Sequence, residues 1–187
     1  MRLVSGALAA AAFIALAAVG VRGDDKQTTF QLSATLIGNN EVPPIATAGR
    51  GHLTATLDTK AQQITFELTY SGLEGGDPPL FAHIHFGPPA VNGGVMVFFC
   101  GGGGKPPCPS SSGGPVTVTG TITPAGCPPL PACVVGPAMQ GIDPLPSEFD
   151  DVVAAILSGN SYANIHTTKF PNGEIRGQVK VHGGDHQ

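Results

Sequence analysis

The chain has 187 residues, of which 9 are Lys or Arg and 13 are Asp or Glu, and its formal net charge is -4. This balance argues against nucleic acid as a partner, because nothing in it would attract a polyanion. Charged residues make up only 12%, and the 27 Gly and 18 Pro favour a turn-rich, all-β protein over one built from long helices.

An apolar segment follows Arg2 at the start of the chain. Residues 3–19 read LVSGALAAAAFIALAAV, and small residues at Gly20 and Gly23 suit a signal-peptidase site before DDKQ. We therefore predict a signal peptide over residues 1–23 and a mature protein that is secreted, periplasmic or held at the cell surface, with no membrane span. A retained membrane anchor is the alternative, because about 17 apolar residues lie at the lower edge of a span.

Alternation of apolar and polar residues predicts most of the strands. The run VMVFF is apolar throughout, as in a strand buried on both faces. The predicted strands before the helix span residues 28–37, 52–58, 63–70, 81–87, 95–99 and 116–123.

Residues 101–146 are rich in Gly and Pro, and they read as an insertion of two long loops that flank the strand at 116–123. The chain has four cysteines, and in an oxidising compartment an even number predicts two disulfides. Three pairings are possible, and we favour Cys100 with Cys108 and Cys127 with Cys133, because short closures cost the least loop entropy. A four-thiolate zinc site is the competing interpretation, although no Cys-x-x-Cys spacing occurs.

One short helix is predicted near residues 147–158. Ser147 is a candidate N-cap, the apolar residues that follow recur at helical spacing, and Gly159 suits a left-handed C-cap. A strand over 161–167 follows directly.

The end of the chain predicts a hairpin around Pro171-Asn172-Gly173. A three-residue loop with Gly173 at positive φ places Ile165 opposite Val179 and His166 opposite Gln178. His166 then shares a face with Tyr162, Asn164 and Arg176, away from the core.

Three histidines make a candidate metal site. His83 and His85 share one face of their strand, because alternate side chains of a strand point the same way. With His166 they offer three neutral imidazoles, which suffice to bind copper, or less favourably zinc. The alternative is three surface or cleft histidines with ordinary hydrogen bonds, since the sequence does not establish that the two strands are neighbours. His52 is either a fourth ligand or an exposed side chain.

Arg176 is predicted to lie near His166, where beside a metal it would attract a small anion. Its alternative role is a solvated strand residue paired with Glu174 or Glu67. Asn39 and Glu41 precede a Pro-Pro stop, and we expect them to be loop residues without chemistry. No nucleophile motif such as Gly-x-Ser-x-Gly occurs, and we expect no catalytic residue.

The segments LIGNNEVPP, ATAGRGHLTATLD, LTYSGLEG, AHIHFGPPAVNGGVMV and GNSYANIHTTKFPNGEIRGQV resemble, in this order, the blocks of the chordin-type (CHRD) domain family. The resemblance covers about residues 28–181 and implies a single CHRD domain over 24–187. It implies an antiparallel Greek-key β-sandwich or barrel, immunoglobulin-like or superoxide-dismutase-like, but no settled activity. The cysteine-bearing insertion at about 101–146 departs from the family's compact pattern.

FAHIHFG is also similar to the His-Val-His-x-x-Gly copper-ligand strand of Cu/Zn superoxide dismutases, which are Greek-key barrels. This weaker resemblance implies copper ligation by His83, His85 and His166 and an anion-guiding role for Arg176. The bridging histidine, the zinc-ligand loop and its aspartate have no match in this sequence, so dismutase activity is not implied.

The sequence as a whole favours an exported CHRD-domain protein that acts as a non-catalytic binding or structural module. Its expected partner is an extracellular protein or surface component that the sequence does not identify. The alternative is a copper or zinc protein with the three-histidine site and dismutase-like chemistry. One equivalent of bound metal per chain would favour the metal-protein hypothesis over the binding-module hypothesis.

Overall fold

The computed structural model describes residues 27–125 and 133–183. The expected signal peptide at 1–23 and Cys127 of the second expected disulfide lie outside these residues. The first expected disulfide, between Cys100 and Cys108, is confirmed. No helix in the described part of the chain is long and apolar enough to cross a bilayer.

Nine strands form one antiparallel sheet among the described residues, and every strand predicted from the sequence is present. Their order is β5-β4-β7-β8-β1-β2-β3-β6, and β9 pairs with β1. Neither β3 and β4 nor β6 and β7 are neighbours, so long connections cross between distant parts of the sheet. The strands are β1 (Thr29–Ile37), β2 (Arg50–Asp58), β3 (Gln63–Ser71), β4 (Phe81–Phe86), β5 (Gly94–Cys100), β6 (Val116–Ile122), β7 (Ser161–His166), β8 (Ile175–Gln178) and β9 (Lys180–His182).

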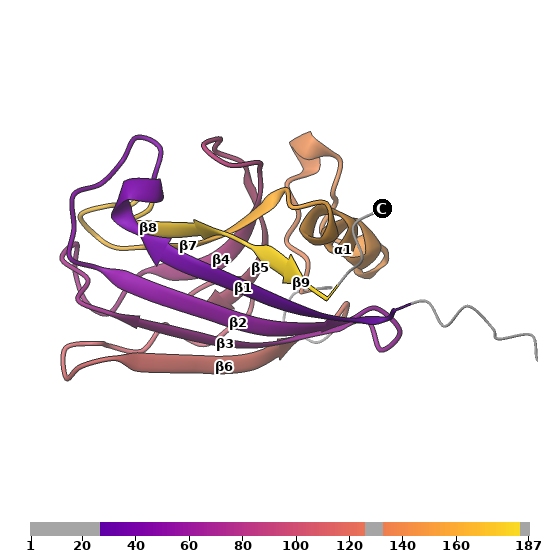
Figure 1. The fold of residues 1–187 in the computed structure, drawn as a ribbon, viewed down its shortest axis with the longest axis horizontal. Coiled ribbons are helices and arrows are strands. Elements are labelled where there is room, and N and C mark those ends of the chain that lie inside the picture. The colour runs from indigo at the N-terminus through magenta and orange to yellow at the C-terminus, as the bar shows by residue number, and fades with distance from the viewer. Residues whose placement is uncertain (1–26, 126–132, 184–187) are drawn as a thin grey trace, which may run out of the picture.

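The sheet curls into a nearly closed barrel around an apolar core (Figure 1). Across its interior the rings of Phe66 in β3 and Phe99 in β5 are 4.7 Å apart between centroids. The predicted helix is present as α1 (Phe149–Leu157), beside one end of the barrel, with Phe149 and Ile156 buried in the core. The expected all-β barrel with one short helix is therefore confirmed.

The start of the helix differs from the prediction. Residues Pro146–Glu148 form a 3-10 turn, η3, so α1 begins two residues after Ser147 and has no side-chain cap. Ser147 donates weakly to Glu148 instead, over 3.4 Å. Gly159 adopts a φ of 76°, as expected of a residue that ends a helix.

The predicted register of the last hairpin is wrong by four residues. Ile165 pairs with Ile175 and Tyr162 with Gln178, because residues 167–174 form a wide loop instead of a tight turn. This loop is closed by a hydrogen bond from the Glu174 amide to the Ile165 carbonyl. A shift by an even number of residues leaves each side chain on its expected face, so His166 still shares a face with Arg176.

Strand β7 is buried at all six positions, which places polar side chains out of water on the outer face of the barrel. Three loops cover this face: the segment around η1 (Gly38–Asn40), residues 87–93 and residues 167–174. The candidate site lies beneath them, on β4, β7 and β8.

Candidate metal centre

His83 and His85 on β4 and His166 on β7 form one cluster. One ring nitrogen from each histidine lies within 4.8 Å of those of the others. The strands are direct neighbours, and the ring centroids of His83 are 4.4 Å from His85 and 4.5 Å from His166. The structure thus brings together the three histidines that the sequence nominated. All three are buried, with exposed fractions of 3%, 8% and 8%.

Backbone carbonyls set the tautomers of two rings. His85 Nδ1 lies 2.8 Å from the Gly93 carbonyl oxygen, and His166 Nδ1 lies 2.8 Å from that of Pro171. A carbonyl only accepts, so each Nδ1 carries the proton and each neutral ring keeps its lone pair on Nε2. Both Nε2 atoms are buried and have no hydrogen-bond partner among residues 27–125 and 133–183, and the same is true of Nδ1 of His83. Orientation of an imidazole by its other nitrogen is the usual second contact of a metal-bound histidine.

The rings are uncharged at neutral pH. Burial, with smaller contributions from His85 and His166, holds the pKa of His83 well below its ordinary value of 6.5. Burial likewise lowers the pKa of His166 and lowers that of His85 to about 4. The neutral imidazole is the form that binds metal, so these histidines need not release a proton before they bind an ion.

Aromatic rings enclose the cluster. The ring of Tyr162 stacks on His85, and Phe98 meets His83 edge-on with centroids 5.0 Å apart. The ring of exposed Phe81 lies 6.1 Å from that of Phe98 and 6.5 Å from that of His83, between centroids. These rings keep water away from the lone pairs and lower the local dielectric constant.

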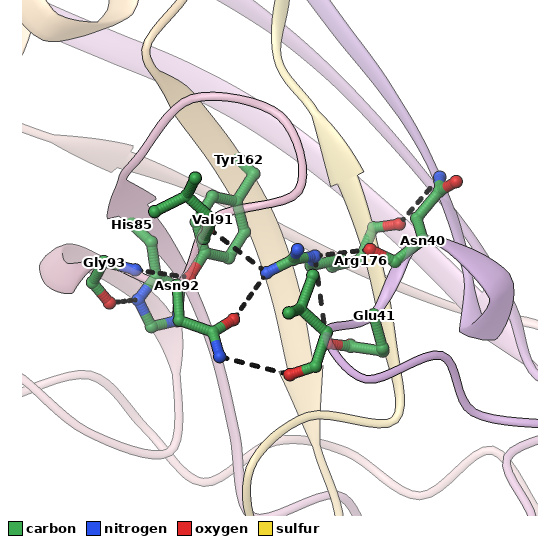
Figure 2. Close-up of polar contacts among 9 residues, drawn as sticks. Asn40, Glu41, His85, Val91, Asn92, Gly93, Tyr162 and Arg176 are labelled. Atoms are coloured by element: carbon green, nitrogen blue, oxygen red, sulfur yellow. Dashed lines mark hydrogen bonds and ion pairs between the residues drawn. The ribbon is translucent and has the colours of Figure 1, made fainter.

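Arg176 is close to the site, and two of its three side-chain nitrogens donate to loop oxygens. Its Nε donates to the Asn40 carbonyl over 2.6 Å, and its Nη1 donates to Asn92 Oδ1 over 2.8 Å (Figure 2). Its guanidinium carbon lies 4.6 Å from the centroid of the Tyr162 ring, and Figure 2 shows Tyr162 between Arg176 and His85. With 4% exposure, Arg176 ties two loops together over the outer face, a geometry that favours a positioning role over free attraction of anions.

Glu41 is the polar residue whose role the sequence reasoning missed. It is 4% exposed, its Oε2 lies 4.0 Å from Arg176 Nε, and its Oε1 has no hydrogen-bond partner. Burial raises its pKa to about 7, against the lowering effects of Arg176 and of a hydrogen bond with Asn164. The sequence offered one signal for this role. Glu41 is a single acidic residue among Asn, Val and Pro in a chain with few charges.

His52 lies apart from the cluster. It is exposed on β2 and pairs with Thr35 of β1 and Thr69 of β3. Among the residues that the structure describes, the group of candidate ligands contains the other three histidines and not His52. This histidine therefore serves as an internal control for the site.

The fold and the cluster together define a small β-barrel domain that holds three buried histidines on its outer face. The CHRD domain model matches residues 32–179, so the chain belongs to the CHRD domain family. A search of curated proteins found no match, and a search of solved structures found none either.

Proposed function

We propose that this CHRD-domain protein is exported and binds a metal ion, copper in the first place, through His83, His85 and His166. One observation carries the proposal: three buried histidines bring one ring nitrogen each within 4.8 Å of the others, and each has a buried ring nitrogen without a hydrogen-bond partner among the described residues. The predicted signal peptide and the Cys100–Cys108 disulfide support export, since such bonds persist in oxidising compartments.

The three nitrogens do not hydrogen-bond to one another or to other groups among the described residues. Nε2 of His85 and Nε2 of His166 each present a lone pair, and the single N–H of a neutral His83 could serve at most one of them. Protonation of more than one ring would place like charges side by side in a dry site. An unsatisfied buried polar group costs about 1–3 kcal/mol, so three of them together are expensive to keep without a ligand. A bound metal ion would satisfy all three lone pairs at once.

The ligand set suits copper and zinc, and the sequence resemblance puts copper first. All three donors are imidazoles, which suit copper and zinc alike. In a tetrahedral zinc site with bonds of about 2.0–2.1 Å, the nitrogens lie about 3.3 Å apart, whereas a trans pair on copper lies about 4 Å apart. The three nitrogens lie within 4.8 Å of one another, a limit that both arrangements satisfy, so the choice of copper rests on the similarity of FAHIHFG to the copper-ligand strand of the dismutases.

This proposal reverses the order of the two hypotheses from sequence. The binding-module hypothesis has no equally specific observation behind it, and its partner stays unidentified. Dismutase-like chemistry is not part of the proposal, because Arg176, which would guide the anion, is buried and its Nε and Nη1 donate to loop oxygens.

The test is the metal content of the protein expressed as the full-length chain, without a His-tag, in medium supplemented with copper and zinc. We expect about one equivalent of copper per chain in the wild type. The variants H83A, H85A and H166A should each retain under a tenth of it. H52A is the matched control and should retain all of it.

Two results would overturn the proposal. One is a folded wild-type protein, by circular dichroism, with no metal above background. The other is an equal loss of metal in H52A and in the cluster variants, which would indicate adventitious binding. One equivalent of zinc in place of copper would overturn the choice of metal and leave the site standing.

A further inference from the structure

Asn164 lies at the centre of the grid of side chains on the outer face. It is directly opposite His83 on β4 and opposite Arg176 on β8. On its own strand it stands between Tyr162 and His166, which point to the same face. Directly opposed residues have Cβ atoms about 4.5–5.5 Å apart, so this short side chain sits beside the histidine cluster among longer neighbours.

The amide of Asn164 is held from one side only. Its side chain hydrogen-bonds to Glu41. A Cβ atom placed on Gly173 would meet Glu41 Oε1 at 2.7 Å and Asn164 Nδ2 at 2.8 Å, so all three groups are packed together. Because Glu41 accepts, the amide turns Nδ2 toward it, and Oδ1 points elsewhere. Asn164 is 2% exposed, and its Oδ1 has no hydrogen-bond partner.

Buried polar atoms without hydrogen-bond partners are therefore concentrated around Asn164 and the histidine cluster. Six buried side-chain atoms lack partners among the described residues, and five of them belong to the three histidines, Asn164 and Glu41. Three imidazoles leave at least one position of a copper or zinc ion open, and in proteins that position commonly holds water. A water bound to a metal is a strong donor, which is the kind of group that Asn164 Oδ1 lacks.

We propose that Asn164 Oδ1 accepts a hydrogen bond from a water molecule bound to the metal ion, and that Glu41 positions the Asn164 amide for this contact. The inference rests on the proposed metal site and adds to it an exchangeable ligand position. Glu41 is not a metal ligand in this account, since the group of candidate ligands does not include it.

The surroundings limit what can occupy this position. Gly173 leaves no room for a side chain above Asn164, and the histidines are almost fully buried. A pocket of about 500 Å³ opens beside the site and is lined by Glu41, Tyr162 and Arg176, among others. Water and other small molecules with an O–H or N–H donor fit this description.

The experiment loads the full-length chain with copper(II) and measures two quantities. Pulsed electron–nuclear double resonance in H2O and D2O detects exchangeable protons of a bound water. Azide titration, followed by its charge-transfer absorption, measures how easily that water is displaced. The variants are N164A and E41Q, and the matched control is N172A, an exposed asparagine in the neighbouring loop.

The wild type and N172A should show the same exchangeable-proton couplings. In N164A the couplings should change, and azide should bind about tenfold more tightly, because the displaced water no longer holds a hydrogen bond. E41Q keeps the volume of the side chain but replaces the carboxyl group with an amide that has one acceptor oxygen and one NH2 group, so it should give an intermediate change. Copper content should remain at one equivalent in all four proteins.

The failures can be told apart. A wild type that binds no copper overturns the proposed function, and this inference falls with it. Copper at one equivalent without exchangeable-proton couplings would overturn this inference but not the proposed function. Couplings and an azide affinity that are the same in N164A as in the wild type would do the same. A loss of copper affinity in N164A would make Asn164 a direct ligand and would also overturn it. If the couplings and azide affinity of E41Q match the wild type while those of N164A change, Glu41 does not position the Asn164 amide.

Discussion

The imidazole of His85 lies parallel to the phenol ring of Tyr162, with an interplanar angle of 8° and centroids 4.6 Å apart. The backbone of Gly93 connects the two side chains. Its amide donates to the Tyr162 hydroxyl over 3.1 Å, and its carbonyl accepts from His85 Nδ1. Tyr162 therefore reports on the candidate site and also helps to orient one of its ligands.

Tyrosine emission should follow copper binding. The chain has two Tyr and no Trp, so the emission comes from Tyr162 and from Tyr70 in the core. We expect one equivalent of copper(II) to quench the Tyr162 component, because the ion would bind to the ring stacked on it. In Y162F the remaining emission should be largely insensitive to copper, whereas Y70F should be quenched almost completely. Equal quenching in the two variants would contradict this placement.

The stability of the metal-free protein should fall in mild acid. The histidines of the cluster have pKa values below 6.5 in the folded state, about 4 for His85, because they are buried. Between about pH 4 and 6.5 the unfolded chain binds more protons than the folded one, so the free energy of unfolding rises with pH. This increase is complete above about pH 6.5. His85 alone contributes on the order of 3 kcal/mol to this change.

Urea denaturation of the metal-free protein at several pH values between 4.5 and 7.5 measures the effect. H85A should show a shallower dependence on pH than the wild type, whatever its absolute stability. Parallel curves for the two proteins would argue against a neutral, buried His85.

Glu41 should act in the opposite direction. Burial raises its folded pKa from 4.5 to about 7, so its favourable contribution is present below pH 4.5 and is lost as the pH rises through about 7. E41Q cannot ionise. The difference in free energy of unfolding between E41Q and the wild type should therefore shift in favour of E41Q by on the order of 3 kcal/mol between pH 4.5 and 8. A difference that does not vary with pH would show that Glu41 is ionised normally.

Glu174 should be the most sensitive carboxylate for stability. It is fully buried in the wide loop after β7, and replacement by Gln puts an amide N–H2 group against its donors. We expect E174Q to lose about 2–4 kcal/mol in urea denaturation, and the exposed E67Q to change by under about 0.5 kcal/mol. The donors to its oxygens are Thr47 Oγ1 at 2.7 Å, Thr167 Oγ1 at 2.8 Å, the Glu74 amide at 2.7 Å and the Gly75 amide at 3.0 Å. Similar losses in the two variants would contradict this role.

Local patterns predicted the strands and the faces of their side chains well. Strand alternation placed His83 and His85 together, and it placed His166 on the correct face even though the hairpin register was wrong. Faces depend only on whether the shift is even or odd, whereas the register depends on the loop. In that loop Glu174 is buried and accepts four hydrogen bonds, which no local sequence pattern indicates.

The proximity of β4 and β7 was beyond local reasoning. The strands are separated in sequence by β5, β6 and α1, and they meet because the sheet topology makes them hydrogen-bonded neighbours. The same holds for Glu41, whose loop crosses the outer face to reach Arg176 and Asn164. Tertiary packing, and not the sequence around NNEVPP, makes this residue part of the site.

X-ray absorption spectroscopy at the copper edge tests the central claim most directly, because multiple scattering from imidazole rings counts the histidines on the metal. For the protein loaded with one equivalent of copper, we predict three imidazole nitrogens at about 2 Å. H83A should reduce this count, and H52A should leave the spectrum unchanged. A wild-type spectrum with one imidazole or none, or with oxygen ligands alone, would contradict a metal site at His83, His85 and His166.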